Sequence, residues 1–221
     1  MCGRFAITLP NEAMTQLFNA VPDNDLPATP NYNVCPTDSV HTITSLEGRR
    51  RLRPMRWGFL PNWYKTISDG PLLINARAES LAQKPAFREA CRIRRCLILC
   101  DGFYEWFREK GQKPIPYRVI RSDGAPLVMA GIWQYWEKEG RRITSCAIVT
   151  TKANSKMAKI HNRLPVIIDH ENWSIWLGEA GKGAARLMRP VKEDILDLSR
   201  VSDAVNSNRA SGIELWDPID S

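Results

Sequence analysis

Short apolar runs alternate with polar turns along most of the chain, at a spacing typical of β-strands. Residues 39–45 and 49–59 flank the turn signal Glu47-Gly48, which predicts a β-hairpin. Between residues 95 and 151, further apolar runs are separated by turn residues, which predicts an antiparallel meander. These turn residues are Gly111, Asp123-Gly124 and Glu139-Gly140. Two shorter strands are expected, over residues 4–8 and 72–77.

Helical periodicity is confined to short segments. Asn11 is a suitable N-cap for a first helix. Further helices are predicted over residues 79–91, 153–159 and 170–177. The tail from Pro190 is predicted to be irregular, and neither a repeat nor a linker interrupts the chain. We therefore predict an α+β fold in which residues 1–221 form a single domain built on antiparallel sheet.

Composition agrees with a β-rich body that has a hydrophobic core. The chain has 221 residues, of which 43% are hydrophobic, with eight tryptophans and fifteen prolines, and this fits one large domain. The net charge of +7 indicates an anionic partner or, alternatively, a basic solvated surface. No uncharged apolar run reaches the length of a membrane span, and the N-terminus lacks a signal pattern. We therefore expect an intracellular protein.

The six cysteines are expected to remain thiols in that compartment. Cys96 and Cys100 share one face of an apolar strand and are expected to fill the core. Cys91, Cys96 and Cys100 do not have the spacing of zinc ligands, and no histidine is near them in the sequence. We predict no metal site and no other cofactor.

Cys2 is the first candidate for chemistry. Removal of Met1 would give it a free α-amine beside its thiol, and this pair can condense with an aldehyde to a Schiff base and then close to a thiazolidine. The two groups titrate at about 7.7–8.0 and about 8.5, which suits neutral pH. The alternative is a cysteine that stands at position two without a role.

Glu105 and His161 are candidates for proton transfer. On a strand, Glu105 would point to the same side as Phe103 and Phe107, and burial there would raise the pKa of its carboxyl group. An exposed edge strand is the alternative. His161 lies in a turn between a helix and a strand, a common place for acid–base residues, although a structural role is as compatible with its position.

Asn75 ends an apolar run and can donate and accept hydrogen bonds at once, so it could orient a reacting group. It could equally be a strand-end cap.

Basic and aromatic residues cluster in the first half of the chain. Arginines crowd the hairpin at residues 49–56, and Trp63 and Tyr64 follow on a loop. Guanidinium groups pair with phosphates and aromatic rings stack on bases, so this combination favours single-stranded nucleic acid. A solvated basic face with core tryptophans is the alternative.

Together, these segments resemble the SOS-response-associated peptidase (SRAP) family of abasic-site processing proteins. The match is in order and covers essentially the whole chain. The matching segments are Met1-Cys2-Gly3-Arg4-Phe5, Tyr32-Asn33-Val34-Cys35-Pro36-Thr37, Arg56-Trp57-Gly58-Phe59, Ile74-Asn75-Ala76-Arg77-Ala78-Glu79, Asp101-Gly102-Phe103-Tyr104-Glu105-Trp106, His161-Asn162-Arg163-Leu164-Pro165 and Val201-Ser202…Val205-Asn206.

The resemblance implies a barrel-like antiparallel sheet with peripheral helices, and a monomer in the cytoplasm, associated with the nucleoid in a bacterium. It implies self-removal of Met1, crosslinking of Cys2 to abasic sites in single-stranded DNA as a thiazolidine, and lyase-type strand cleavage. By similarity, Glu105 would open the deoxyribose ring and move protons, His161 would assist Schiff-base chemistry, and Asn75 would position Cys2. The residues that would hold DNA are Arg4, Asn33, Arg77 and Arg163 on the backbone, and Trp63 and Tyr64 against bases.

Three features qualify the resemblance. Cys35 stands where alanine is common, Asn162 replaces a frequent aspartate, and Cys2 cannot close a thiazolidine while Met1 remains. Two other functions fit parts of the pattern. One is an amidohydrolase with an N-terminal cysteine nucleophile, although the chain lacks an Asn-Gly pair and the length usual for such enzymes. The other is a non-covalent binder of single-stranded nucleic acid.

Overall fold

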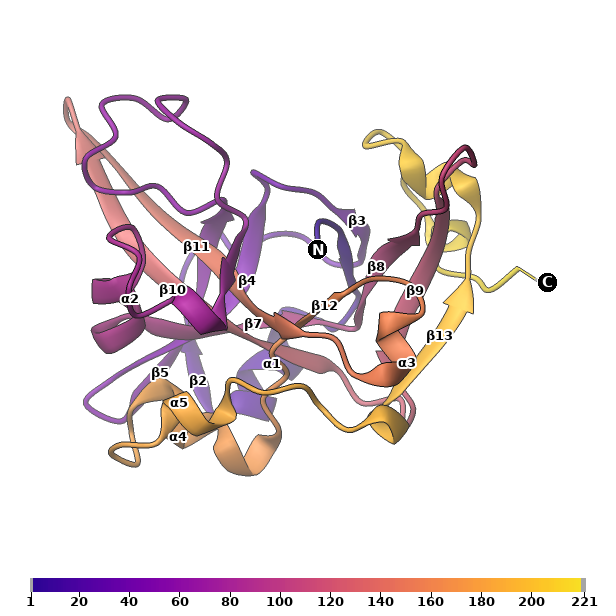
Figure 1. Ribbon diagram of the computed structural model, residues 1–221. Helices are drawn as coiled ribbons and strands as arrows, with labels where there is room; N and C mark the ends of the chain where they lie inside the picture. Colours follow the sequence, from indigo (N-terminus) through magenta and orange to yellow (C-terminus); the bar gives the residue numbers. More distant parts are fainter. Residues whose placement is uncertain (1, 220–221) are drawn as a thin grey trace.

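Five strands close into a barrel in the computed structural model, which describes residues 2–219 (Figure 1). Around the ring, β5 pairs with β4, β4 with β7, β7 with β10 and β10 with β11, all antiparallel. A parallel pairing of β11 with β5 closes the ring, where Cys146 lies opposite Trp57. The barrel strands are β4 (Ser39–Leu46), β5 (Arg49–Trp57), β7 (Arg95–Cys100), β10 (Leu127–Lys138) and β11 (Arg141–Lys152).

Two tight turns set the register of the barrel hairpins. Glu47 and Gly48 both have positive φ, at 52° and 75°, and so do Glu139 and Gly140, at 49° and 74°. Positive φ at both central residues is the two-residue turn whose twist matches that of antiparallel strands. The predicted turns and the β4–β5 hairpin are therefore confirmed.

A second antiparallel sheet packs beside the barrel, in the strand order β13-β9-β8-β1-β3. Phe5 of β1 lies against Trp57 of the barrel, with ring centroids 5.1 Å apart, so the N-terminal segment runs along the junction of the two sheets. The strands of this sheet are β1 (Phe5–Ile7), β3 (Asn31–Val34), β8 (Gly102–Phe107), β9 (Ile115–Arg121) and β13 (Leu196–Arg200).

Three short strands extend the barrel sheet. β2 (Ala20–Pro22) lies parallel to β5, β6 (Asn75–Arg77) lies parallel to β11, and β12 (Arg163–Pro165) lies antiparallel to β11. Thr150 of β11 is therefore opposite Arg77 on one side and Pro165 on the other. This arrangement brings the ends of β6 and β12, which are far apart in sequence, to the same part of β11.

The helices are short and peripheral, as the resemblance implied. Phe18 of the first helix stacks on Trp173 of the fourth at 4.1 Å, and the indole N–H of Trp176 donates to the carbonyl of Cys96 at 2.8 Å, so these two helices pack against the barrel together. The helices are α1 (Asn11–Phe18), α2 (Arg88–Ile93), α3 (Ser155–Ala158), α4 (Trp173–Leu177) and α5 (Ala184–Leu187). Single 3₁₀ turns lie at Ala78–Ser80, His170–Asn172, Glu193–Ile195, Asp203–Asn206 and Ile213–Leu215.

Several local predictions were wrong. Asn11 is the first residue of α1, and Pro10 occupies the N-cap position. The Asn11 side chain accepts a hydrogen bond from His41 Nε2 at 2.9 Å and does not cap the helix. The predicted helix over 79–91 is reduced to a 3₁₀ turn and to α2, which begins at Arg88. The tail contains a strand, β13, whose five residues pair with β9.

The predicted meander divides between the two sheets. The chain leaves the barrel at Cys100, and β8 begins at Gly102 in the second sheet. A Cβ atom at Gly102 would overlap the backbone carbonyl of Val119, so this close strand contact requires glycine. Cys96 and Cys100 are fully buried, as expected of core residues, and all six cysteines, which lie within the described residues, are free thiols. Among residues 2–219, no helix has the length and apolar character needed to span a bilayer.

Candidate active site

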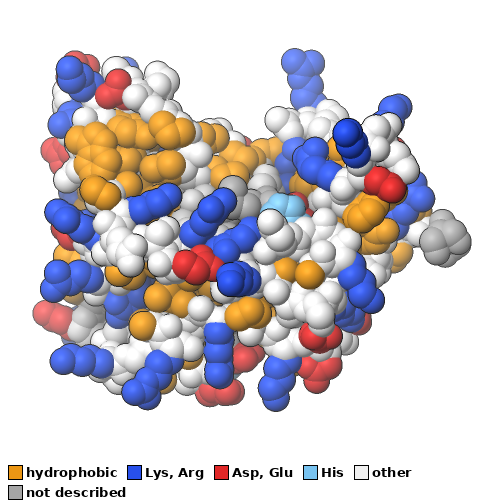
Figure 2. Space-filling view, viewed as in Figure 1, with side chains coloured by type: hydrophobic (Ala, Val, Ile, Leu, Met, Phe, Trp, Pro, Cys, Tyr) orange, Lys and Arg blue, Asp and Glu red, His pale blue; other side chains and the backbone are white. Residues whose placement is uncertain are grey.

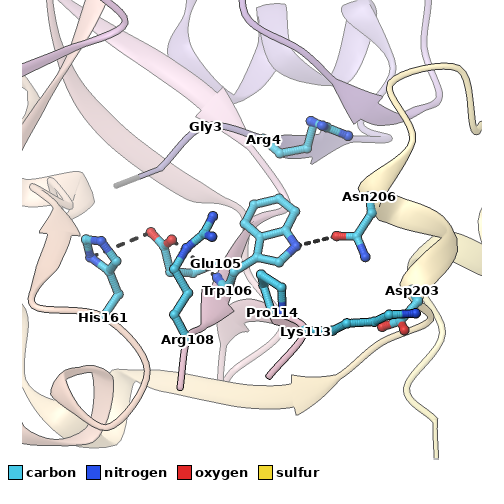
Figure 3. Close-up of a pocket in the computed structure, with 10 residues that line it drawn as sticks. All are labelled: Gly3, Arg4, Glu105, Trp106, Arg108, Lys113, Pro114, His161, Asp203 and Asn206. Carbon is cyan, nitrogen blue, oxygen red and sulfur yellow. Dashed lines mark hydrogen bonds and ion pairs between the residues drawn. The ribbon is translucent and has the colours of Figure 1, made fainter. Parts of the chain in front are cut away.

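A cavity of about 490 Å³ opens at the junction of the two sheets (Figure 3). Its walls come from the segment that leads into β1, from β8 and the loop after it, and from the C-terminal segment. His161 adds the remaining side, across from Glu105. Figure 2 shows basic side chains gathered over the middle of the same face of the molecule. The cavity therefore combines a buried carboxylate, a histidine and a basic rim.

Cys2 is held at this junction by its backbone. Asn75 Nδ2 donates a hydrogen bond of 2.8 Å to the Cys2 carbonyl, and the Cys2 side chain is only 1% exposed. Asn75 is fixed in turn, because the preceding carbonyl, that of Ile74, accepts from the amide of Ile148 and from the indole of Trp57, each at 3.0 Å. Burial raises the pKa of the Cys2 thiol, and the nearby charge of Glu105 raises it further, so the sulfur is protonated at neutral pH.

Glu105 is a buried carboxylate on β8, with 4% of its surface exposed. The interpretation of this segment as an exposed edge strand is therefore wrong, and the predicted strand is confirmed. Glu105 Oε1 accepts from the amide of Trp106 at 3.3 Å, and Oε2 lies 3.9 Å from His161 Nδ1. A carboxylate and an imidazole at this distance can exchange a proton after a small movement or through a water molecule.

His161 is oriented by the turn between α3 and β12. Its amide donates to the carbonyl of Met157 at 2.9 Å, at the end of α3, and its Nδ1 accepts from the amide of Arg163 at 3.0 Å. Because Nδ1 accepts that hydrogen bond, the proton of the neutral ring is on Nε2. The fold thus selects one tautomer.

Arg163, predicted to hold the DNA backbone, has its guanidinium engaged within the protein. It forms two hydrogen bonds with Glu79, of 2.7 and 2.9 Å, and a third with the carbonyl of Thr150, at 2.7 Å. The hydrogen bonds from Arg163 lower the pKa of the Glu79 carboxyl to about 2. Arg77, from the same predicted set, is exposed on β6.

Arg4 and Asn33 bind the C-terminal segment. Arg4 Nη1 donates to Asn33 Oδ1 at 2.6 Å and to the carbonyl of Val205 at 2.9 Å, and Asn33 Nδ2 donates to the carbonyl of Ala210 at 2.6 Å. Both side chains are buried. Asn206 of the same segment accepts from the Trp106 indole at 2.6 Å. This network fixes the wall of the cavity opposite His161.

The two loop aromatics differ in exposure. Trp63 is 53% exposed, whereas Tyr64 is 8% exposed and packs with Leu60 and Trp136. The two rings meet edge to face at 6.4 Å. Figure 2 shows hydrophobic side chains gathered at the upper left of the molecule, next to the basic region, on the side where this loop and the ends of β10 and β11 lie in Figure 1.

Three of the five arginines on β5 of the β4–β5 hairpin are paired with carboxylates of other segments. Arg50 is paired with Glu179, and Arg51 and Arg53 are both paired with Asp23. The composition of this hairpin suggested a nucleic-acid surface because sequence does not show which carboxylates fold against it. Instead, Arg108 and Lys113 line the cavity, and sequence analysis missed both. Their only sequence signal is that they follow Glu105 closely.

Cys35 is a further free thiol of the protein. Cys35 is half-buried beside Asn33, and its thiol donates to the Asn33 carbonyl at 3.2 Å. Burial raises the pKa of the Cys35 thiol, which the charge of Arg4 partly offsets. Within residues 2–219, no three His, Cys, Asp or Glu side chains are arranged to hold a metal ion.

A family model described as SOS response associated peptidase (SRAP) matches residues 1–208. The chain belongs to this family. It is 36% identical to the abasic site processing protein YoqW of Bacillus subtilis, over 97% of this chain and 98% of that protein. It is 31% identical to the abasic site processing protein YedK of Escherichia coli, over 99% of this chain and 100% of that protein.

Solved structures confirm the fold of this SRAP protein. A protein from Bacteroides thetaiotaomicron superposes with a TM-score of 0.79 at 25% identity, over 92% of this chain and 94% of that chain. A protein from Bordetella bronchiseptica superposes with a TM-score of 0.75 at 26% identity, over 91% and 100% of the two chains. The predicted α+β class with a barrel-like sheet and peripheral helices is therefore confirmed.

Proposed function

We propose that this SRAP protein processes abasic sites in single-stranded DNA and that Cys2 forms the covalent link. One observation carries the proposal: Asn75 holds the Cys2 carbonyl at 2.8 Å, directly before Gly3, which lines the cavity together with Glu105 and His161. The names of YoqW and YedK as abasic site processing proteins support the choice of substrate.

The reaction requires that the Met1–Cys2 peptide bond is first hydrolysed, which frees the Cys2 α-amine. Met1 lies outside the described residues. We assign this hydrolysis to the protein itself, with the Cys2 sulfur as nucleophile and Glu105 as the group that moves protons. The intact mass of protein made in a translation system without methionine aminopeptidase tests this step, since loss of the methionine is expected in wild type and not in a Cys2→Ala variant.

The crosslink then forms in two balanced steps. The amine adds to the aldehyde carbon of the ring-opened deoxyribose, and loss of water gives a Schiff base. The sulfur adds to the imine carbon while its proton passes to the nitrogen, which closes the thiazolidine. Because Asn75 binds the carbonyl, it leaves both the amine and the sulfur of Cys2 available for these steps.

The electrostatics of the site fit this order. Burial raises the pKa of the Cys2 thiol, so the sulfur carries the proton that the nitrogen gains when the ring closes. Glu105 is placed to assist ring opening and proton transfer, and His161 to assist formation or hydrolysis of the Schiff base. Hydrolysis of that intermediate, or elimination from it, would account for crosslink reversal and for lyase-type strand cleavage.

The DNA strand is proposed to lie across the cavity. The exposed Arg77 and Trp63 would contact a phosphate and a base, respectively, and Tyr64 would support Trp63 from beneath. Arg4, Asn33 and Arg163 would act by holding the walls against which the strand lies, because their polar atoms are engaged within the protein.

A denaturing gel after incubation with abasic single-stranded DNA tests the proposal. A shifted band is expected for wild type and for Cys35→Ala, which removes a different thiol, and none is expected for Cys2→Ala. A band of equal strength from Cys2→Ala would disprove the role of Cys2. If wild type gives no band and binds abasic and intact strands equally, the protein is a non-covalent binder of single-stranded DNA.

A further inference from the structure

Glu79 is joined to His161 through a single residue, Arg163. The side chain of Arg163 binds both oxygens of Glu79, at 2.7 and 2.9 Å, and its backbone amide donates to His161 Nδ1 at 3.0 Å. The Arg163 side chain is only 11% exposed. One residue therefore connects a carboxylate outside the cavity to the imidazole inside it.

The ion pair also ties two strands together across β11. Glu79 follows β6, the strand that begins with Asn75, and Arg163 begins β12. Both strands pair with β11 beside Thr150, whose carbonyl accepts from Arg163 Nη2 at 2.7 Å. The start of β12 is also held by its pairing with β11, where Arg163 lies opposite Lys152. The Glu79–Arg163 pair adds the side-chain contact that joins this turn to the end of β6.

We propose that Glu79 is a positioning residue for His161, an inference that rests on the proposed function. By holding Arg163 in place, Glu79 keeps the Arg163 amide directed at His161 Nδ1 and so keeps the ring proton on Nε2. Without the Glu79 carboxylate, the turn gains freedom, the amide leaves Nδ1, and the neutral ring populates both tautomers. Only the fraction of the protein with its proton on Nε2 would then keep the donor and acceptor arrangement of the wild-type site.

The chain offers a matched control in the Arg50–Glu179 pair. That pair is also bidentate, with distances of 2.9 and 2.7 Å, and Arg50 also donates to a backbone carbonyl, that of Phe18. It joins β5 to the segment after α4, and neither of its residues lines the cavity. Glu79→Gln and Glu179→Gln therefore each remove a bidentate ion pair of similar geometry, of which only one is connected to His161.

The first experiment measures the single-turnover rate of crosslinking at saturating abasic single-stranded DNA. We expect Glu79→Gln to lower this rate by at least about tenfold, because a misplacement of about 1 Å can cost on the order of a hundredfold. The affinity for intact single-stranded DNA should stay within about twofold of wild type. Glu179→Gln should leave both quantities unchanged, and Glu79→Asp, which keeps the charge, should retain more of the rate than Glu79→Gln.

Two outcomes would overturn the proposal. If Glu179→Gln slows crosslinking as much as Glu79→Gln, the effect is one of general stability. If Glu79→Gln weakens binding of intact DNA by the factor by which it slows crosslinking, Glu79 acts on DNA binding through Arg163 and not on His161.

A second readout does not depend on crosslinking. Nitrogen NMR of the histidine side chains reports which ring nitrogen carries the proton. The His161 signal should show a single tautomer with the proton on Nε2 in wild type and in Glu179→Gln, and a mixture in Glu79→Gln. An unchanged tautomer in Glu79→Gln would disprove the positioning role, whereas absence of crosslinking by wild type would disprove the proposed function and leave this measurement valid.

Discussion

The barrel and the cavity are built from different strands, and they differ in whether their buried polar atoms find hydrogen-bond partners. The indole nitrogens of Trp57 on barrel strand β5, and of Trp173 and Trp176 on α4 where it packs against the barrel, each donate to a backbone carbonyl. Close to the cavity, Arg4 Nε, Asn75 Oδ1 and Arg163 Nε are buried and have no hydrogen-bond partner among residues 2–219, whereas Ser45 Oγ is such an atom on barrel strand β4. Buried polar atoms without partners are costly, so the cavity gives up stability that the barrel must supply.

This difference predicts that stability and chemistry can be changed separately. Substitutions in the barrel should lower the free energy of unfolding and leave the reaction rate of the folded protein intact. Substitutions in the cavity should lower the reaction rate and leave the free energy of unfolding unchanged.

Phe18→Ala should have the largest effect. Phe18 is fully buried and stacks on Trp173 at 4.1 Å, so the substitution leaves a cavity between α1 and α4. We expect the free energy of unfolding to fall by about 3–5 kcal/mol. Denaturant titration measures the loss, and crosslinking by the remaining folded protein should keep its wild-type rate. A matching drop in that rate would show that the barrel and the cavity are not independent.

The stability of the barrel should also depend on pH through His41. Burial lowers the pKa of His41 to about 4, and its Nε2 donates to Asn11 and to the carbonyl of Pro27. The unfolded chain binds a proton near pH 6.5 and the folded one only near pH 4, so stability falls as pH decreases between these values. The loss is about 3 kcal/mol at most.

Denaturant titrations at pH 7 and pH 4.5 check this dependence. In His41→Gln, which keeps a donor toward the same acceptors, stability should change less between the two pH values. If the free energy of unfolding of wild type and of His41→Gln falls by the same amount between pH 7 and pH 4.5, other groups cause the pH dependence.

Glu105→Gln should lower the rate of crosslinking by about a hundredfold, as expected when a group that transfers protons is removed. The free energy of unfolding should not fall, because the substitution replaces a buried carboxylate with a neutral side chain of the same shape. Since the charge of Glu105 raises the pKa of the Cys2 thiol, Glu105→Gln should also shift the alkylation of Cys2 to lower pH. If Glu105→Gln lowers the free energy of unfolding and leaves the crosslinking rate unchanged, Glu105 has a structural role and not a catalytic one.

Trp63→Ala should have the smallest effect. More than half of this side chain is exposed, so stability should hardly change, while the affinity for single-stranded DNA should fall by about 1–2 kcal/mol. Leu46→Ala is a matched control on an exposed apolar residue of the β4–β5 hairpin and should leave affinity unchanged. Equal losses in the two variants would argue against a base contact at Trp63.

The sequence predicted the elements that depend on local chemistry. The turns at Glu47-Gly48 and Glu139-Gly140 and the strand through Glu105 follow from neighbouring residues, and the structure contains them. Closure of the barrel depends on a parallel pairing between β5 and β11, which are about ninety residues apart, and no local pattern encodes such a contact. The same limit explains why β13 was missed, since its pairing with β9 decides its conformation.

The candidate site shows the same division. Cys2, Asn75, Glu105 and His161 could be selected by residue type and by their resemblance to SRAP motifs, and the fold brings them together. The partners of Arg50, Arg53 and Arg163 could not be found in this way. Whether an arginine faces solvent or a carboxylate depends on residues such as Asp23, Glu79 and Glu179, which are distant in sequence.

The pairing of Phe5 with Phe103, together with the Asn75 bond to the Cys2 carbonyl, has a consequence for the entropy of the reaction. Residues close to a chain terminus ordinarily fray, and ordering each of them costs about 1–2 kcal/mol. Here that cost falls on folding, so in the proposed reaction the aldehyde would meet a Cys2 that has already lost its conformational freedom.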